Sequence, residues 1–202
     1  MKSIPINQEL QKLLDDYITW FNKKDFELPT DENHENGLGM DYYCSREYLD
    51  TVIDKGKDHK GPPEFGITCS LQTNTHVPEE ARSKSLSFCT SLSSYLGAKY
   101  TAVHVYYPPN GFMSWHCNWD CPGYNILLSH SDGGGFFRHL EDGEIKTIQD
   151  PAGWSAKVGY YGGKDEEPYW HCAGSTSPRQ TIGFVIPDKN MWEMMVEDIS
   201  SE

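Results

Sequence analysis

The sequence predicts a mostly β protein of the α+β class, in which a helical N-terminal region precedes a closed or double-layered sheet. Two observations carry this prediction. The second half of the chain contains about seven short segments rich in β-branched and aromatic residues, separated by turn residues. The first half instead has apolar residues at helical spacing between capping residues.

Three helices are expected in residues 1–98, each between a recognisable start and stop. They are NQELQKLLDDYITWF with Asn7 as its N-cap, SREYLDTVIDKG with Ser45 as its N-cap, and PEEARSKSLSFCTSLSSYLG, which stops at Gly97. The polar stretches from Lys23 to Asp41 and from Gly56 to Val77 are expected to be loops.

Seven strands are expected in residues 99–187. They are KYTAVHVYY, YNILLSHS, GFFRHL, IKTIQD, WSAKVGYYGG, YWHCAG and RQTIGFVIP. Asp132 and three glycines separate the second strand from the third, and the Asp-Gly of EDGE predicts a hairpin between the third and the fourth. A short helix, NMWEMMVEDI, is expected in residues 188–202. The length of 202 residues favours a single domain made of these three parts.

Composition excludes several classes of function. A formal net charge of −13 argues against nucleic acid as a partner, because phosphate binding depends on lysine and arginine. No apolar run is long enough for a membrane span, and the N-terminus lacks the apolar core of a secretory signal. Six cysteines at scattered spacings do not form a disulfide framework. We therefore expect reduced thiols and a cytoplasmic protein.

The triplet Trp-His-Cys occurs twice, around His116 and His171. His116 follows a Pro-Pro-Asn-Gly turn, and His171 lies in the penultimate predicted strand. Arg179 and Thr181 follow in the last strand, two positions apart. Because side chains alternate across a strand, Arg179 and Thr181 are expected on the same face.

This order of residues resembles the Fe(II)/2-oxoglutarate-dependent dioxygenases, which carry an H-x-D/E motif after an early strand, a distant histidine on a late strand and an R-x-S/T on the last one. The resemblance runs from about residue 100 to residue 187. The run YYPPNGFMSWHCNWDCPGYN…GFFRHL…GW…YWHC…RQTIGF is most similar to the small prolyl-hydroxylase-like members found in bacteriophage and marine microbes. The resemblance implies a double-stranded β-helix core (jelly-roll, cupin-like), with N-terminal helices packed on one sheet.

The resemblance also implies an enzyme, an oxygenase of the hydroxylase type. Two imidazoles and one oxygen donor would hold Fe(II) and leave open positions for 2-oxoglutarate and O₂. His116 and His171 match the two imidazoles. Arg179 matches the planar, permanently charged partner of the far carboxylate of 2-oxoglutarate, and Thr181 adds a hydroxyl donor. Oxidative decarboxylation of 2-oxoglutarate would then be coupled to oxidation of a substrate that the sequence does not identify.

The sequence departs from the family pattern at the third ligand. Asn118 occupies the position two residues after His116, and Asp120 lies two residues further on. Asn118 could bind iron through its amide oxygen, or Asp120 could reach the metal if the turn curls. Alternatively the site is degenerate, and the fold is a non-catalytic binding module. We favour an oxygen donor, because Arg179 and Thr181 have no evident use without a bound dicarboxylate.

A structural zinc protein is the other alternative, since zinc accepts mixed nitrogen and sulfur ligands. The available donors are His116, Cys117, Cys121, His171 and Cys172. If each histidine faces inward from an extended strand, however, the adjacent cysteines face outward, so one metal would not take all of them. The other strand histidines, His104, His130 and His139, are expected to be core or surface residues.

Overall fold

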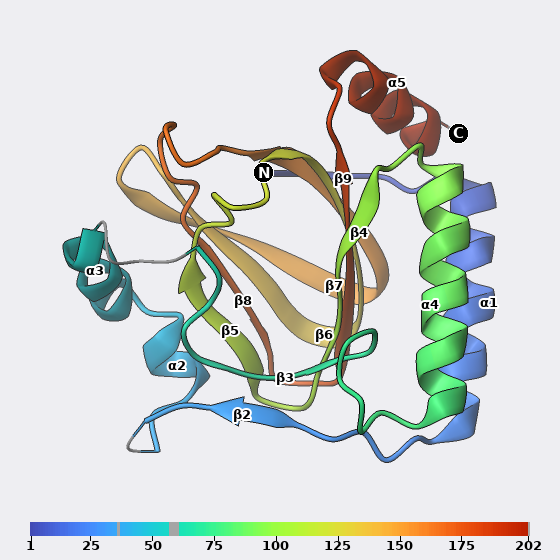
Figure 1. Ribbon diagram of the computed structural model, residues 1–202, viewed down its shortest axis with the longest axis horizontal. Helices are drawn as coiled ribbons and strands as arrows, with labels where there is room; N and C mark the ends of the chain where they lie inside the picture. The colour runs from blue at the N-terminus through green and yellow to red at the C-terminus, as the bar shows by residue number, and fades with distance from the viewer. Residues whose placement is uncertain (36, 57–60, 202) are drawn as a thin grey trace.

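The computed structural model describes residues 1–35, 37–56 and 61–201. Its centre is a nine-stranded sheet that closes on itself, with helices on both sides (Figure 1). The predicted fold class, a mostly β protein with a closed, jelly-roll-like core, is confirmed.

Five helices of the described part of the chain surround the sheet. They are α1 (Gln8–Lys24), α2 (Met40–Tyr43), α3 (Arg46–Lys55), α4 (Glu79–Tyr95) and α5 (Lys189–Ser200). Both predicted N-caps are confirmed, because the Asn7 side chain accepts a hydrogen bond from the backbone N–H of Leu10, and Ser45 from that of Tyr48. Among the described residues, no helix has the length and apolar character needed to cross a membrane.

The strands are connected by antiparallel pairing throughout. They are β1 (Lys2–Ile4), β2 (Asp31–Asn33), β3 (Gly66–Ser70), β4 (Tyr100–Tyr107), β5 (Gly111–His116), β6 (Gly123–Glu141), β7 (Glu144–Tyr161), β8 (His171–Ser175) and β9 (Arg179–Ile186). Strand β6 pairs with β9 through its first half and with β8 through its second half. The ring β6–β8–β5–β3–β4–β9 then returns to β6, so the sheet encloses an interior.

The prediction of four separate strands between residues 123 and 161 is wrong. The chain forms two long strands instead, β6 and β7, which are joined by the predicted hairpin at Asp142 and Gly143. The glycines after Asp132 do not end β6. Gly133 and Gly134 have φ values of +96° and +85°, and the β6–β7 register shifts there. This irregularity lets one strand pass from the β9 side of the barrel to the β8 side.

Three strands lie in the region predicted to be helices and loops. Strands β1 and β2 have only 3 residues each and β3 has 5, which is too short for a periodic pattern to stand out. Strand β3 lies in the predicted loop from Gly56 to Val77, of which residues 57–60 are outside the described residues. It bridges β4 and β5 and so helps to close the ring.

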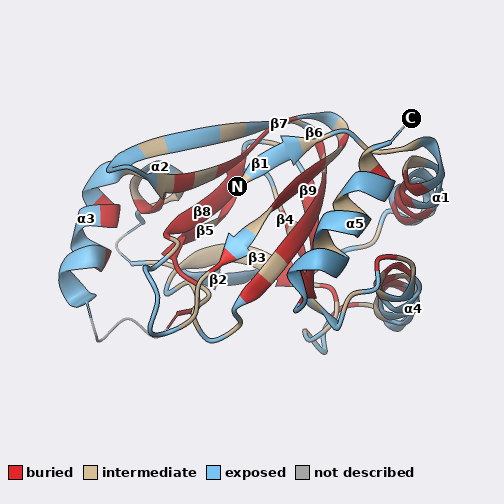
Figure 2. Ribbon diagram, turned by 90° about the horizontal axis from the view of Figure 1, so that it is seen from above, coloured by how far each residue is buried: buried red, intermediate tan, exposed pale blue. Residues whose placement is uncertain are grey.

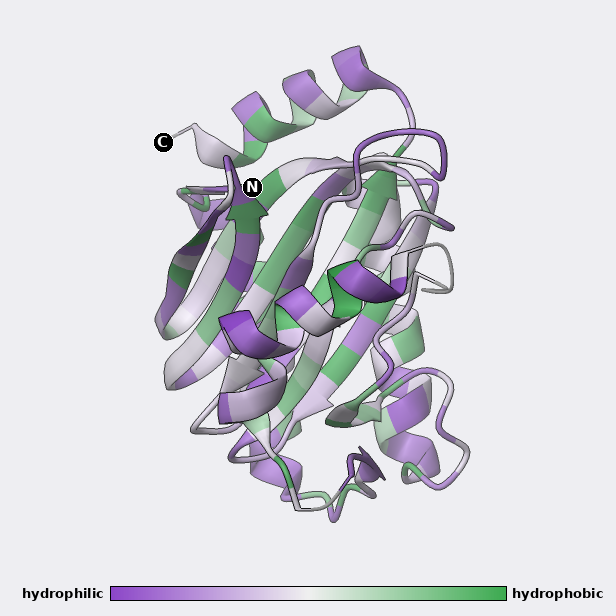
Figure 3. Ribbon diagram, turned by 90° about the vertical axis from the view of Figure 1, so that its left-hand side faces the viewer, coloured by the Kyte–Doolittle hydropathy of each residue, from purple (hydrophilic) through white to green (hydrophobic). Residues whose placement is uncertain are grey.

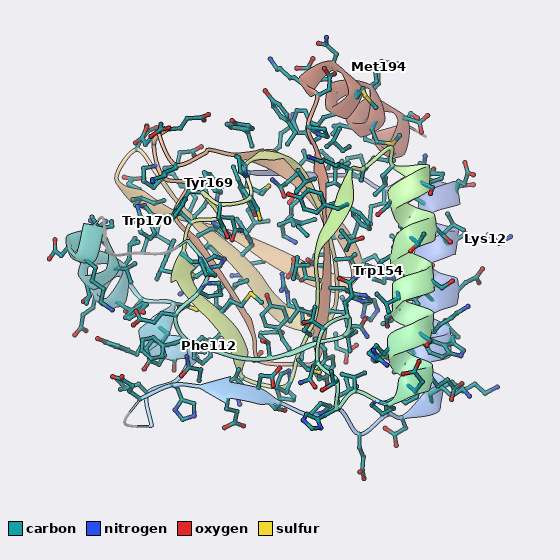
Figure 4. All side chains as sticks on the ribbon, in the orientation of Figure 1. Lys12, Phe112, Trp154, Tyr169, Trp170 and Met194 are labelled. Carbon is teal, nitrogen blue, oxygen red and sulfur yellow. The ribbon has the colours of Figure 1, made fainter. Side chains whose placement is uncertain are left out.

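Two hydrophobic clusters cover the outside of the sheet on opposite sides, so the expectation that the N-terminal helices pack on one sheet is wrong. The larger joins α1, α4 and α5 to β6, β7 and β9, and includes Leu14, Leu92, Ile126 and Trp154. The smaller joins α2 and α3 to β5, β6 and β8. Figure 4 shows Phe112 and Trp170 on the side of α2 and α3, and Trp154 on the side of α1 and α4.

Alternation along the strands leaves the other face of the sheet pointing into the barrel. Bands of hydrophobic and hydrophilic residues follow one another along the strands (Figure 3). All residues of β8 and β9 are nevertheless buried (Figure 2), because helices cover their outer face and the barrel encloses the inner one. The polar residues of these strands are therefore held away from water.

Candidate active site

A cavity of about 210 Å³ lies inside the barrel, and most of the residues singled out from the sequence line it. These residues are His116, Asn118, His171, Arg179 and Thr181. Asp120 is exposed and is not among the lining residues. The barrel thus brings the two predicted histidines, the asparagine and the Arg/Thr pair to one cavity.

His116 and His171 face each other across neighbouring strands. They are register partners in β5 and β8, and their ring centroids are 4.2 Å apart. The register of β5 shifts between Met113 and His116, and both of these side chains line the cavity. Residues three apart face opposite sides of a regular strand, so the irregularity is what places both inside.

Backbone carbonyls fix the orientation of both imidazoles. Nδ1 of His116 donates to the carbonyl oxygen of Ser114 at 2.7 Å, and Nδ1 of His171 donates to that of Tyr169 at 2.8 Å. A carbonyl can only accept, so each Nδ1 carries a hydrogen and the lone pair of a neutral ring lies on Nε2. Metal-binding histidines commonly have this arrangement.

Aromatic packing holds His171 as a neutral base. Its ring stacks on Tyr161 at 4.7 Å and on Phe137 at 5.4 Å between centroids. Burial, and then the neighbouring His116, lower the pKa of His171 well below its usual value. Nε2 therefore keeps its lone pair at neutral pH.

Asn118 extends the histidine pair by one side chain. Its Nδ2 lies 3.2 Å from Nε2 of His171, and its backbone carbonyl accepts from the N–H of Cys121 at 3.0 Å in a tight turn. This turn directs Asn118 into the cavity and leaves Asp120 at the surface. Two imidazoles and one amide therefore converge at this end of the cavity.

The cysteines beside the histidines do not join them. Cys117 and Cys172 are buried in the outer cluster with Trp115 and Trp170. Cys121 lines the cavity, yet within the described part of the chain no three or more His, Cys, Asp or Glu side chains group closely enough to hold a metal ion. The mixed nitrogen and sulfur set considered for zinc is not assembled in this arrangement.

Arg179 lies elsewhere in the cavity lining, at the start of β9. Its Nη2 donates to Oγ of Ser129 at 3.2 Å, and the same Oγ lies 3.2 Å from Oγ1 of Thr181. Its guanidinium carbon is 4.7 Å from the centroid of the Tyr107 ring. Nη1 of Arg179 is buried and has no hydrogen-bond partner among the described residues.

Two charged residues behind Arg179 were missed by sequence reasoning. Nε of Arg179 donates to Oδ2 of Asp150 at 2.7 Å, and Lys157 forms an ion pair with Oδ1 of the same carboxylate. Burial acts to raise the pKa of Asp150, but the charges of Arg179 and Lys157 outweigh it and hold that pKa below its usual value. A lysine between Ala156 and Val158 looks like a solvent-facing strand residue in sequence, which is why it gave no clear signal.

Gly135 leaves the space that this charged group needs. A Cβ on Gly135 would lie 2.9 Å from Oδ2 of Asp150 and 3.1 Å from Cδ of Arg179. The last glycine of the Asp-Gly-Gly-Gly segment therefore serves close packing in the site as well as the bend in β6.

The remaining strand histidines lie outside the cavity lining. His104 is buried between the sheet and the helices, near Tyr17, Cys89 and Gln180, and burial lowers its pKa to about 4. His130 packs against Trp154, and His139 is buried beside Tyr169. These are packing environments, as the sequence analysis expected for core histidines.

No protein-family model matches the chain, and no curated protein matches it. Among solved structures, it is similar to a Pseudomonas putida prolyl-4-hydroxylase, with 13% identity over 85% of this chain and 98% of that one and a TM-score of 0.35. A Trichoplax adhaerens prolyl hydroxylase in complex with a hypoxia inducible factor peptide gives 15% identity over 96% of both chains and a TM-score of 0.37.

A cupin-like protein from Thermotoga maritima gives 16% identity over 48% of this chain and 71% of that one, with a TM-score of 0.27. Likenesses at this level do not identify an activity, so the function of this chain has to be inferred from its cavity.

We expect Asp150→Asn to destabilise the protein by about 3–5 kcal/mol at pH 7, because two buried cations would lose their common anion. Urea unfolding of both proteins measures the difference. Because the pKa of Asp150 is lowered in the folded state, its contribution is present above the unfolded value of about 3.9 and is lost as the pH falls through the folded value. The difference in the free energy of unfolding between variant and wild type should therefore become smaller in acid. An equal gap at pH 7 and in acid would contradict this assignment.

Proposed function

We propose that the protein is a non-haem Fe(II)- and 2-oxoglutarate-dependent oxygenase of the hydroxylase type. The proposal rests mainly on one observation: the same cavity is lined both by two oriented, inward-facing imidazoles and by an arginine whose Nη1 has no partner among the described residues. The first feature suits a metal ion, and the second suits a carboxylate. Their combination favours a dicarboxylate cosubstrate that reaches from one to the other.

The donor set fits a divalent iron ion. His116 and His171 would bind it through Nε2, since Nδ1 of each ring is engaged with a backbone carbonyl. Asn118 would supply the third donor through Oδ1 once its amide has turned over, because in the structure its Nδ2 is the atom that faces Nε2 of His171. A neutral amide oxygen compensates less charge than a carboxylate would, so we expect weaker binding than in a His₂/Asp set.

The arginine end fits a carboxylate. Arg179 is 2% exposed and lacks a partner for Nη1, and leaving a buried guanidinium donor unsatisfied is costly. A carboxylate would accept from Nη1 and from the hydroxyl of Thr181. The ring of Tyr107 packs against the guanidinium and restricts its movement.

Bound iron would supply the oxidative decarboxylation of 2-oxoglutarate by O₂ to succinate and CO₂, coupled to oxidation of a substrate. The residues of this chain would orient the metal ligands and shield the cavity from water. Tyr161 and Phe137 hold the His171 ring in place, while Met113, Leu127 and Ala173 give the cavity apolar walls that exclude water.

A non-catalytic binding module is the second candidate, and Asn118 is the observation that favours it. Without a carboxylate beside the histidines, the barrel would bind a dicarboxylate at Arg179 and perform no oxidation. The two candidates differ in turnover and agree on ligand binding, so a turnover assay separates them.

We expect the purified protein with Fe(II) to form succinate from 2-oxoglutarate in an O₂-dependent reaction. Arg179→Met should raise the KM for 2-oxoglutarate at least about 30-fold, because a buried charge partner is worth about 2 kcal/mol or more. Arg46→Met, which removes an exposed arginine on α3, serves as the matched control and should leave KM unchanged. Measuring succinate by chromatography at a series of 2-oxoglutarate concentrations gives the KM of each protein.

Binding of 2-oxoglutarate without any succinate would support the binding module instead. Full turnover by Arg179→Met with an unchanged KM would show that the carboxylate binds elsewhere.

Replacing Asn118 tests the metal site. Asn118→Asp should increase affinity for Fe(II) or Mn(II) by about tenfold or more, because a ligand charge is added. Asp120→Asn makes the reverse chemical change two residues away at an exposed position and should leave affinity unchanged. Metal titration followed by calorimetry measures both variants. A loss of affinity in Asp120→Asn, with no gain in Asn118→Asp, would assign the third ligand to Asp120.

A further inference from the structure

Asp150 and Lys157 lie behind Arg179 and outside the cavity lining. Their side chains are fully buried, which is rare for these residue types. Ser155 completes the group, because its hydroxyl donates to Oδ1 of Asp150 at 3.2 Å and accepts from Nζ of Lys157 at 3.2 Å. Burying these charges costs desolvation free energy, which has to be offset by interactions or by a functional role.

The group carries a net charge of +1, because two cations share one carboxylate. Asp150 uses one oxygen for each cation, Oδ1 for Lys157 and Oδ2 for Arg179. The Nε edge of Arg179 is therefore occupied, and its Nη1 has no partner in the part of the chain that the structure describes. An anion at Nη1 would make the group neutral.

Lys157 determines how much of this charge a ligand meets. If only Asp150 and Arg179 were present, they would form a neutral pair, and an incoming carboxylate would gain little from Coulomb attraction. Lys157 cancels the charge of Asp150, so Asp150 can orient the guanidinium through Nε without neutralising it. Bidentate and charge-assisted contacts depend on such orientation.

We propose that Asp150 and Lys157 are positioning residues for the carboxylate site: Asp150 fixes the direction of the Arg179 guanidinium, and Lys157 preserves its full charge for one carboxylate of the ligand. This inference rests on the proposed function for the identity of the ligand, 2-oxoglutarate. The matching charge is that of a single carboxylate, and neither positioning residue touches the ligand itself.

Equilibrium binding of 2-oxoglutarate under anaerobic conditions with Mn(II) in place of iron tests the inference without turnover. Lys157→Met should weaken binding by about tenfold or more, equivalent to about 1.4 kcal/mol. The double variant Asp150→Asn/Lys157→Met keeps the net charge at +1 and an oxygen acceptor for Nε. It should bind within about threefold of the wild type. Isothermal titration calorimetry gives the dissociation constants.

Lys146→Met is the matched control, because it removes an exposed lysine from the same strand, β7. It should bind like the wild type. If Lys157→Met does not fold, Lys157→Gln makes the same charge change while keeping an N–H donor for Asp150. Circular dichroism verifies that each variant is folded before titration.

Recovery of binding in the double variant is the result that a merely structural role would not give. Binding by Lys157→Met and Lys157→Gln equal to the wild type would overturn the inference. A double variant as weak as the single one, or a wild type that binds no 2-oxoglutarate, would also overturn it. The expected binding pattern in a protein that forms no succinate would retain the positioning role and reject the oxygenase function. Normal turnover with unchanged KM in Lys157→Met would retain the oxygenase function and reject the positioning role.

Discussion

Alternation of side chains across the closed sheet decides which residues face the cavity and which pack against the helices. In β8, His171 and Ala173 line the cavity, while Cys172 between them packs into the cluster with α2 and α3. In β9, Arg179 and Thr181 line the cavity, while Ile182 and Phe184 pack under α1 and α4. A shift of one residue in either strand would bury the helix-facing residues in the cavity and expose the site.

This division lets the protein combine a polar interior with a stable core. The apolar contacts lie mainly outside the barrel, where the helices cover the sheet. The interior can therefore hold Arg179, Asp150 and Lys157, whose burial would be unfavourable in an apolar environment without compensation. Each of their charges has a partner in the group, and the surplus of one positive charge is directed toward the cavity. The same residues that cost stability would thus provide the electrostatic basis for the proposed carboxylate binding.

The sequence allowed α1, α3, α4 and α5 and the caps at Asn7 and Ser45 to be anticipated, because these depend on local residue patterns. The short helix α2 and the distribution of the helices over two sides of the sheet were not anticipated, because they depend on tertiary packing. The long strands β6 and β7 could not be anticipated, because Gly133 and Gly134 look like a turn in the sequence. Only the pairing of β6 with β8 and β9 shows that this strand continues past them. Strand β3 could not be predicted either, because its 5 residues are too few to show a clear periodic pattern.

In the site, His116, His171, Arg179 and Thr181 could be nominated from their order and spacing. Asp150 and Lys157 could not, because an inward-facing lysine in a strand has the same sequence pattern as a solvent-facing one. The choice between Asn118 and Asp120 depends on the geometry of one turn, in which the carbonyl of Asn118 accepts from Cys121. That geometry favours Asn118 as the side chain nearest the histidines.

In the proposed function, His116, His171 and Arg179 bring iron and 2-oxoglutarate together in one cavity. Anaerobic addition of Fe(II) and then 2-oxoglutarate tests it directly, because chelation of the metal by the keto acid gives a visible metal-to-ligand charge-transfer band. We predict this band in the wild-type protein and its absence in His171→Ala. A wild-type protein that shows no band, or a His171→Ala protein with an undiminished one, would show that these residues do not hold iron and 2-oxoglutarate together.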